Sequence, residues 1–341
     1  MRKTAVLVLM LFLFLALLAT AFAQGVNETL SLTLPRLDWS LAVPGPGFVL
    51  EQKYMIGDGT GARFMAVNRK TSMALSGSLE RALRDGTPRE CRDHYWQNLQ
   101  KGPFRMEQVR MSEMGEMATV EYFIREVQGI PVNQRNLYGY FVRGGYWMYL
   151  HLSKPLFQPR DETLFRSLLD RARIVPKTTG STWDVGYRVS DRHSLFLSVP
   201  RTWADEIDRP RENSPPTITY WPREDPSSKV MVTPIWSQKG VNPDFNRPKR
   251  IRALVEDGGR ALLPQAVEKE LVLREVRGRS AHGFYYTLTD RAPKSGEHKY
   301  MTQGGVGVAD LLLMFTLFFN DRDSTAIQPA LEMLTSARSS P

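Results

Sequence analysis

The sequence predicts an α+β protein of two tandem domains, each a mostly antiparallel sheet with helices on both faces, an α/β/α sandwich. Three observations lead to this prediction. Short alternating strands are separated by turns rich in glycine and proline, segments with helical periodicity interrupt them, and the same order of elements occurs twice. With 341 residues, 42% of them hydrophobic and 24% charged, the chain is long enough to bury two cores.

Residues 1–23 have the pattern of a secretory signal peptide. A basic pair follows the first methionine, Ala5–Leu18 is apolar throughout, and Ala21–Ala23 is a small-residue cleavage box. We therefore expect cleavage before Gln24 and export of the chain to the periplasm or the cell exterior. The alternative is an uncleaved leader that anchors the protein in a membrane, because the apolar stretch is nearly long enough to span a bilayer.

Residues 24–176 are expected to form the first domain. Its strands alternate between apolar and polar residues, and its helices repeat apolar residues at helical spacing. Gly144 and Gly145 supply the positive φ angles that a tight turn between two long strands requires. In chain order, the expected elements are strands Trp39–Val43, Tyr54–Ile56, Ala62–Val67 and Met73–Leu79, helix Pro88–Leu99, strands Met117–Glu126, Leu137–Val142 and Tyr146–Leu152, and helix Asp161–Ile174.

A small, polar linker is expected over residues 177–183, and a second domain with the same plan over residues 184–341. Leu311–Phe319 is apolar at nearly every position, which predicts a strand covered on both faces. The expected elements are strands Leu195–Pro200, Ile218–Trp221 and Val230–Val232, helix Arg247–Leu262, strand Gly283–Leu288, a strand pair over Thr302–Phe319, and helix Ala326–Ala337.

The order of these elements resembles the PsbP/Mog1-like family. The resemblance rests on a strand ending in Val43–Pro44, a small hairpin, a helix, the strand pair Gly139–Leu152 and a closing helix, and it covers residues 36–176 and 184–338. It implies an α/β/α sandwich in two tandem copies. Members of the family include an accessory protein of the photosynthetic oxygen-evolving complex, a Ran-binding nuclear import factor and exported bacterial proteins without a known activity. The resemblance therefore implies a non-catalytic accessory or binding role.

Composition argues against several classes of function. The formal net charge is +9, and the excess is spread, with 20 basic and 16 acidic side chains in residues 24–176 and 23 and 20 in residues 177–341. We expect no nucleic-acid partner, because the basic residues form no stripe with interleaved aromatic residues. The densest basic run, Arg247–Arg252, is interpreted as a solvated helix start. The five histidines and the single cysteine lack metal-ligand spacing, so we expect neither a metal nor a cofactor.

Two candidates for a catalytic nucleophile each have a simpler interpretation. Cys91 could be a thiolate activated by His94, but its helical spacing favours a buried core position. Ser280 lies in a sequence that approaches a nucleophile elbow, but His282 stands where a glycine is needed and a strand follows. We therefore assign no catalytic residue. An exported hydrolase that uses Ser280 or the Cys91–His94 pair remains an alternative.

A row of aromatic residues is the strongest candidate for a ligand site. Trp147, Tyr149 and His151 are alternate residues of one expected strand and share a face, and Tyr138 and Tyr140 lie on the neighbouring strand. They could form the floor of a pocket for a glycan, a peptide or an apolar ligand. The alternative is that they are core residues beneath the closing helix of the first domain.

These observations favour an exported, non-catalytic binding or accessory module. Its partner is an unidentified protein or small ligand, and it contacts a membrane only if the leader stays uncleaved. The alternatives are the exported hydrolase described above and a membrane-tethered interaction protein.

Overall fold

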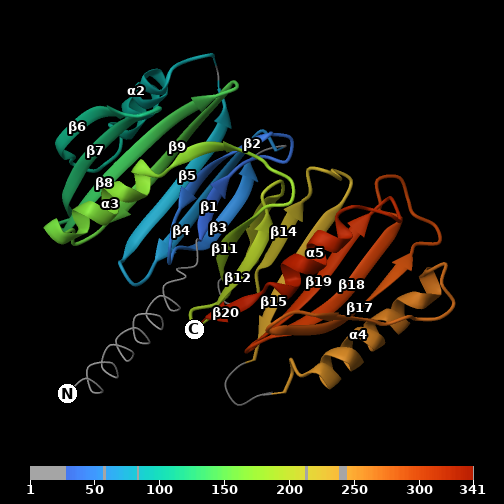
Figure 1. Cartoon of the computed structure of the whole chain (residues 1–341). Coiled ribbons are helices and arrows are strands. Elements are labelled where there is room, and N and C mark those ends of the chain that lie inside the picture. Colours follow the sequence, from blue (N-terminus) through green and yellow to red (C-terminus); the bar gives the residue numbers. More distant parts are fainter. Residues whose placement is uncertain (1–27, 57–58, 83, 212–213, 238–243, 341) are drawn as a thin grey trace, which may run out of the picture.

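The computed structural model describes residues 28–56, 59–82, 84–211, 214–237 and 244–340. Within these ranges the chain forms four α-helices, and strands make up most of the regular structure (Figure 1). None of the described helices is both long enough and apolar enough to cross a membrane. The predicted leader lies outside the described residues.

The centre of the first half is a seven-stranded antiparallel sheet in the order β3-β4-β5-β9-β8-β7-β6. The predicted pairing of Leu137–Val142 with Tyr146–Leu152 is confirmed, and Gly144 and Gly145 form the turn at φ angles of 56° and 74°. The strands are β3 (Val49–Ile56), β4 (Gly61–Asn68), β5 (Met73–Arg81), β6 (Glu107–Met114), β7 (Met117–Val127), β8 (Ile130–Arg143) and β9 (Tyr146–Lys154).

One face of this sheet is covered by a small antiparallel sheet, β1-β2-β10, and by helix α3. The helix buries Phe165, Leu168 and Leu169 in a shared core. The expected helix Asp161–Ile174 is therefore too long, since the residues after the helix turn back into a strand. The elements are β1 (Thr29–Leu32), β2 (Trp39–Pro44), the 3-10 turn η1 (Pro159–Asp161), α3 (Glu162–Asp170) and β10 (Arg173–Pro176).

Helix α2 (Pro88–Leu99), which confirms the helix predicted there, lies against the opposite face over β7, β8 and β9. A capping box fixes its start: the Thr87 hydroxyl accepts the backbone N–H of Glu90, and the Glu90 carboxylate accepts the backbone N–H of Thr87. Cys91 and Trp96 are buried between the helix and the sheet. A second, smaller core thus forms on this face.

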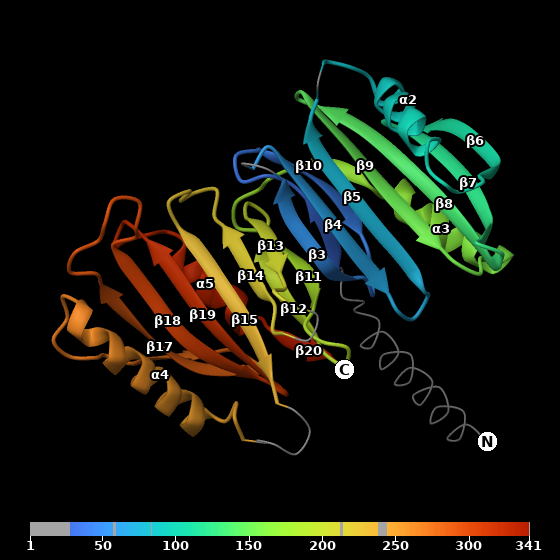
Figure 2. The same cartoon turned by 180° about the vertical axis from the view of Figure 1, so that it is seen from behind.

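The second half has the same pairing order as the first. Its main sheet runs β13-β14-β15-β19-β18-β17-β16, and β11-β12-β20 corresponds to β1-β2-β10. Helix α5 lies on the same side as α3, and α4 on the same side as α2 (Figures 1 and 2). The elements are β11 (Thr182–Arg188), β12 (Ser194–Pro200), β13 (Ala204–Asp208), β14 (Thr217–Trp221), β15 (Lys229–Trp236), α4 (Pro248–Leu262), η2 (Leu263–Gln265), β16 (Arg274–Arg277), β17 (Ala281–Thr289), β18 (Tyr300–Val308), β19 (Leu311–Phe319), α5 (Ile327–Thr335) and β20 (Arg338–Ser340).

Strand β3 joins the two halves. It pairs with β13 through Lys53 and Ile207 and with β11 through Leu50 and Tyr187. Beside these contacts Lys53 Nζ lies 2.5 Å from the carboxylate of Asp205, and the Tyr187 hydroxyl donates to the other carboxylate oxygen at 2.9 Å. Apolar residues of both halves belong to one continuous core. The halves are therefore packed together through a shared interior.

The predicted α/β/α sandwich with helices on both faces is wrong, because antiparallel sheet dominates the structure and its few helices are short. Seven strands about 4.8 Å apart span about 29 Å, whereas a 12-residue helix such as α2 is about 18 Å long. One such helix covers only part of a sheet. On the side of α3 and α5, the small sheets β1-β2-β10 and β11-β12-β20 supply most of the remaining cover.

The prediction that Leu311–Phe319 is covered on both faces is also wrong. In β19 buried residues alternate with Met314, Thr316 and Phe318, which are half-buried. Toward the beginning of the strand, Leu312 is buried in the core beneath α4 and Met314 packs against that core. The remaining outward residues belong to an uncovered part of the sheet.

Candidate functional site

A wide sheet surface between α2 and α4 is left uncovered in both halves (Figure 2). Because side chains alternate along a strand, the residues between those of the main core point to this surface. We call it the open face. Its outward side chains are Tyr54, Arg63, Met65, Ser76, Tyr138, Tyr149, His151, Trp221, Met231, Thr316 and Phe318.

The structure places the five predicted site residues on one face, with Tyr138 opposite His151 and Tyr140 opposite Tyr149. The alternative interpretation, core beneath the closing helix of the first domain, is wrong because α3 packs on the other side of the sheet. The intervening residues of β9, among them Met148 and Leu150, point to the side of α3. It is α2, from earlier in the chain, that covers part of the aromatic row.

Two of the five residues are buried by α2. Trp147 and Tyr140 are 4% and 1% exposed, which removes them from contact with any ligand in solution. The His94 ring meets the Trp147 indole edge-on at 5.3 Å, and the Tyr95 ring stacks on Tyr140 at 6.0 Å. These two members of the row act as core residues.

The other three, Tyr138, Tyr149 and His151, are half-buried at the border of the open face. The ring of His151 stacks on Tyr138 with centroids 4.0 Å apart and an angle of 8° between the planes. His151 Nε2 lies 3.0 Å from Asn136 Oδ1, and Nδ1 lies 3.5 Å from the Ser76 hydroxyl. Packing around the imidazole lowers the pKa of His151 to about 4, so the ring is neutral near pH 7.

The depressed pKa of His151 predicts an acid-sensitive fold. In the unfolded chain the histidine takes up a proton near pH 6.5, whereas in the folded chain it does so only near pH 4. The stabilising contribution is fully present above pH 6.5 and is lost as the pH falls to 4, up to about 3 kcal/mol. Urea unfolding of the wild type and of His151→Gln between pH 4 and pH 6.5 measures how the free energy of unfolding depends on pH in each protein. Equal pH slopes in the two proteins would contradict this assignment.

Sequence reasoning missed the most exposed part of the open face. Tyr54 on β3 is 45% exposed and Met65 on β4 is 36% exposed. Arg63 stands between them on β4, where its guanidinium donates to Glu80 at 2.8 Å. The sequence of β4 held a signal for this surface, because small or apolar residues alternate with larger outward ones. Ala62, Phe64 and Ala66 are buried, whereas Arg63 and Met65 face outward.

The second half extends the open face with apolar and hydroxyl residues, of which Met231 and Thr316 are half-buried and Thr219 is buried. Thr219 on β14 lies opposite Met231 on β15, which lies opposite Thr316 on β19. Trp221 and Phe318 stand near the same end of their strands and are also half-buried. Lys229 Nζ lies 6.0 Å from the Trp221 ring centroid.

The two candidate nucleophiles, Cys91 and Ser280, do not belong to the open face. Cys91 is fully buried, its thiol contacts the backbone oxygen of Met148 at 3.9 Å, and burial raises the pKa of Cys91 to about 12. The neighbouring His94 packs on Trp147. The Ser280 hydroxyl donates to the backbone oxygen of Ala337 at 3.3 Å. Neither arrangement activates a nucleophile by a nearby base.

Sequence reasoning also missed a Ser–His–Asp contact. His193 Nδ1 lies 2.8 Å from the Ser190 hydroxyl, and Nε2 lies 2.7 Å from the carboxylate of Asp310. The Ser190 oxygen also accepts the backbone N–H of Arg192, as in a turn. The contact joins the β11–β12 turn to the β18–β19 turn.

Among the described residues, no group of three or more His, Cys, Asp or Glu side chains is arranged to hold a metal.

No family model and no curated protein matches the sequence. Among solved structures, one similar chain is cyanobacterial PsbP (CyanoP) from Synechocystis sp. PCC 6803, at 11% identity and a TM-score of 0.31, covering 45% of this chain and 96% of that one. Another is the apo form of the immunity protein TplEi of T6SS from Pseudomonas aeruginosa, at 12% identity and a TM-score of 0.31, covering 92% of this chain and 97% of that one. The similarity to a PsbP-like structure is weak and assigns no function.

Proposed function

We propose that this protein is an exported, non-catalytic binding module that holds a protein partner on its open face. The observation that carries the proposal is the uncovered sheet between α2 and α4, on which Tyr54 and Met65 stand exposed beside Arg63. Aromatic residues, methionine and arginine are the side chains enriched in protein interfaces. A rigid sheet presents them with little loss of conformational freedom on binding.

We further propose that the module is a tandem pair of one PsbP/Mog1-like plan. The support is the matching strand order in the two halves and the matching positions of α2 with α4 and of α3 with α5. The two halves, joined through β3, turn their open faces to the same side (Figure 2). A tandem arrangement thus doubles the surface that one partner can cover.

The contacts of Cys91 and Ser280 favour a binding module over the hydrolase alternative. A reactive cysteine needs a thiolate in an accessible, electropositive place, and the high pKa and full burial of Cys91 oppose both. Ser280 is bonded to a backbone oxygen, and the neighbouring His282 is bonded to Glu275 instead. Alanine at either position is expected to leave the biological role intact.

Site-specific crosslinking in the producing cells tests the proposed function. A photoreactive amino acid in place of Met65 is expected to give one dominant protein adduct, because the side chain lies in the centre of the proposed interface. The same group in place of Ile130, which is 66% exposed at the β7–β8 turn, serves as the matched control.

Charge reversal by Arg63→Glu is expected to weaken the Met65 adduct at least tenfold while the purified protein keeps its unfolding midpoint, since the pair with Glu80 is exposed. An adduct that forms equally well from both photoreactive positions, or that survives Arg63→Glu unchanged, contradicts the proposal.

A further inference from the structure

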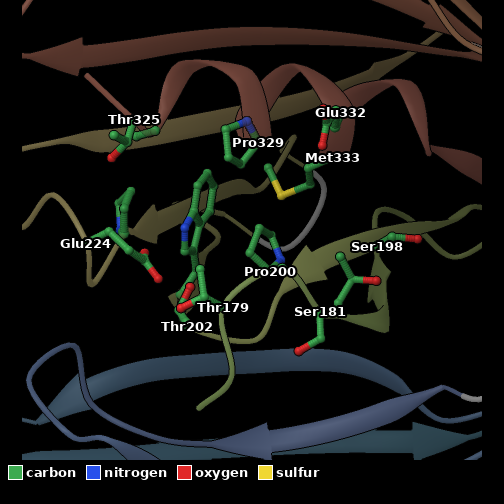
Figure 3. A pocket seen from close by; sticks show the side chains of 15 residues that line it. Thr179, Ser181, Ser198, Pro200, Thr202, Glu224, Thr325, Pro329, Glu332 and Met333 are labelled. Carbon is green, nitrogen blue, oxygen red and sulfur yellow. The ribbon is translucent and has the colours of Figure 1, made fainter. Parts of the chain in front are cut away.

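A cavity of about 310 Å³ lies in the second half, on the side of α5 and thus away from the open face (Figure 3). Residues 179–182, which lead into β11, form one wall. The loops after β12 and β14 form the next wall, and α5 with the two residues before it closes the cavity. This volume is in the range of small-molecule sites.

The walls of the cavity are mainly apolar. The indole of Trp203, which is 4% exposed and packed against Tyr220, forms part of the wall together with Met333 of α5. Three prolines complete this surface: Pro200, Pro222 and Pro329. Prolines and a packed indole have few conformations to lose, so the cavity keeps its shape without a ligand.

The charge of the cavity is negative. Among the described residues that line it, Glu224 and Glu332 are the charged ones, and lysine, arginine and histidine are absent. Figure 3 shows the two carboxylates on opposite sides of the cavity, one after β14 and the other on α5. No described cation lies within ion-pair distance of either carboxylate, but the charge of Glu224 acts on the nearby Lys177, and Glu332 accepts a hydrogen bond from Gln328 at 2.9 Å.

Hydroxyl groups supply the remaining polar surface. Thr179, Ser181 and Thr202 lie along the lower side of the view in Figure 3, across the cavity from Glu332. Hydroxyls accept hydrogen bonds from ammonium groups as readily as they donate them. An apolar middle with an acidic group at each side matches a ligand with an aliphatic centre and cationic ends.

We propose that this cavity binds a linear aliphatic amine with a positive charge at each end, a diamine or polyamine. One ammonium group pairs with Glu224 and the other with Glu332, and the methylene chain lies against Trp203 and the prolines. The protein as a whole carries a formal charge of +9, so its net field repels such a ligand. Binding must therefore come from the local site. The inference is independent of the partner proposed for the open face.

Calorimetric titration of the purified protein tests the proposal with 1,4-diaminobutane, spermidine and 1-aminobutane as probes. The two polyvalent amines are expected to bind saturably at one site, and 1-aminobutane at least tenfold more weakly, because it leaves one carboxylate without a partner. Glu224→Gln and Glu332→Gln are each expected to weaken diamine binding roughly tenfold. Both side chains are exposed, so both variants should keep the wild-type unfolding midpoint.

The matched control is Glu297→Gln, an exposed carboxylate of the same half outside the cavity, which should bind as the wild type does. The absence of saturable binding up to 10 millimolar, taken as roughly the weakest useful affinity, contradicts the proposal. Equal affinities for 1-aminobutane and 1,4-diaminobutane would also contradict the proposal. An equal loss of diamine binding in all three variants would contradict it as well. Nα-acetyl-lysinamide distinguishes a free amine from a lysine side chain, and tighter binding of this probe than of the diamines would overturn the two-ended assignment.

Discussion

Lys53→Ala is expected to lower the free energy of unfolding by about 3–5 kcal/mol. Lys53 and Asp205 are 2% and 3% exposed and lie where β3 of the first half meets β13 of the second. Alanine removes the cation and leaves the Asp205 carboxylate in a low-dielectric interior, where the neutral Tyr187 hydroxyl donates to it. Burial and the Asp205 charge raise the pKa of Tyr187 well above its usual value, so this phenol stays neutral and cannot replace a cation.

Chemical denaturation measures this loss, and two variants control for it. The double replacement Lys53→Met with Asp205→Leu removes both charges, so it is expected to recover most of the lost stability. Arg89→Ala breaks an ion pair with Glu113 in which both partners are more than half exposed, and it should change the stability far less than Lys53→Ala does. If Lys53→Ala and Arg89→Ala have similar effects, the ion pair does not stabilise the junction between the halves.

Trp147→Ala is expected to cost about 3–5 kcal/mol, the usual loss for a large buried aromatic residue. The Trp147 indole fills the small core between α2 and the sheet, where it contacts His94 and Tyr95. Its removal leaves a cavity in the core beneath α2. We expect the loss in thermal unfolding experiments and, in hydrogen exchange, faster exchange of the α2 amides.

Trp147→Phe separates packing from hydrogen bonding at the same position. The indole Nε1 is buried without a hydrogen-bond partner among the described residues, so phenylalanine removes an unsatisfied donor as well as part of the ring. These effects offset each other, and we expect a loss of about 1 kcal/mol. A Trp147→Ala variant as stable as the wild type would show that the residue is exposed and available to a ligand after all.

The sequence predicted the local elements well because their determinants are local. The glycine pair between β8 and β9 fixes a turn, and Thr87, Pro88 and Glu90 fix the start of α2. The alternation of Trp147, Tyr149 and His151 correctly placed them on one side of a strand. None of these inferences required knowledge of a distant part of the chain.

The cover of each sheet face depended on distant contacts and could not be predicted. From the sequence, α3 was the helix expected to cover the aromatic row, because α3 follows β9 in the chain. In the structure α2 covers part of the row instead. β10 joins β2 across more than a hundred residues, and Lys53 pairs with Asp205 across 152. An isolated lysine in a strand gives no sign of such a partner. The lining of the cavity is likewise assembled from four separate segments.

Oxidative footprinting by hydroxyl radicals tests the central claim, an open sheet face that a partner covers, most directly. In the purified protein Tyr54 and Met65 are expected to oxidise fast, and the buried Tyr140 and Trp147 slowly. In the producing cells Tyr54 and Met65 should be protected, whereas the control Ile130 should be labelled as in the purified protein. Equal labelling of Tyr54 and Met65 in cells and in the purified protein would contradict the claim that a partner occupies the open face.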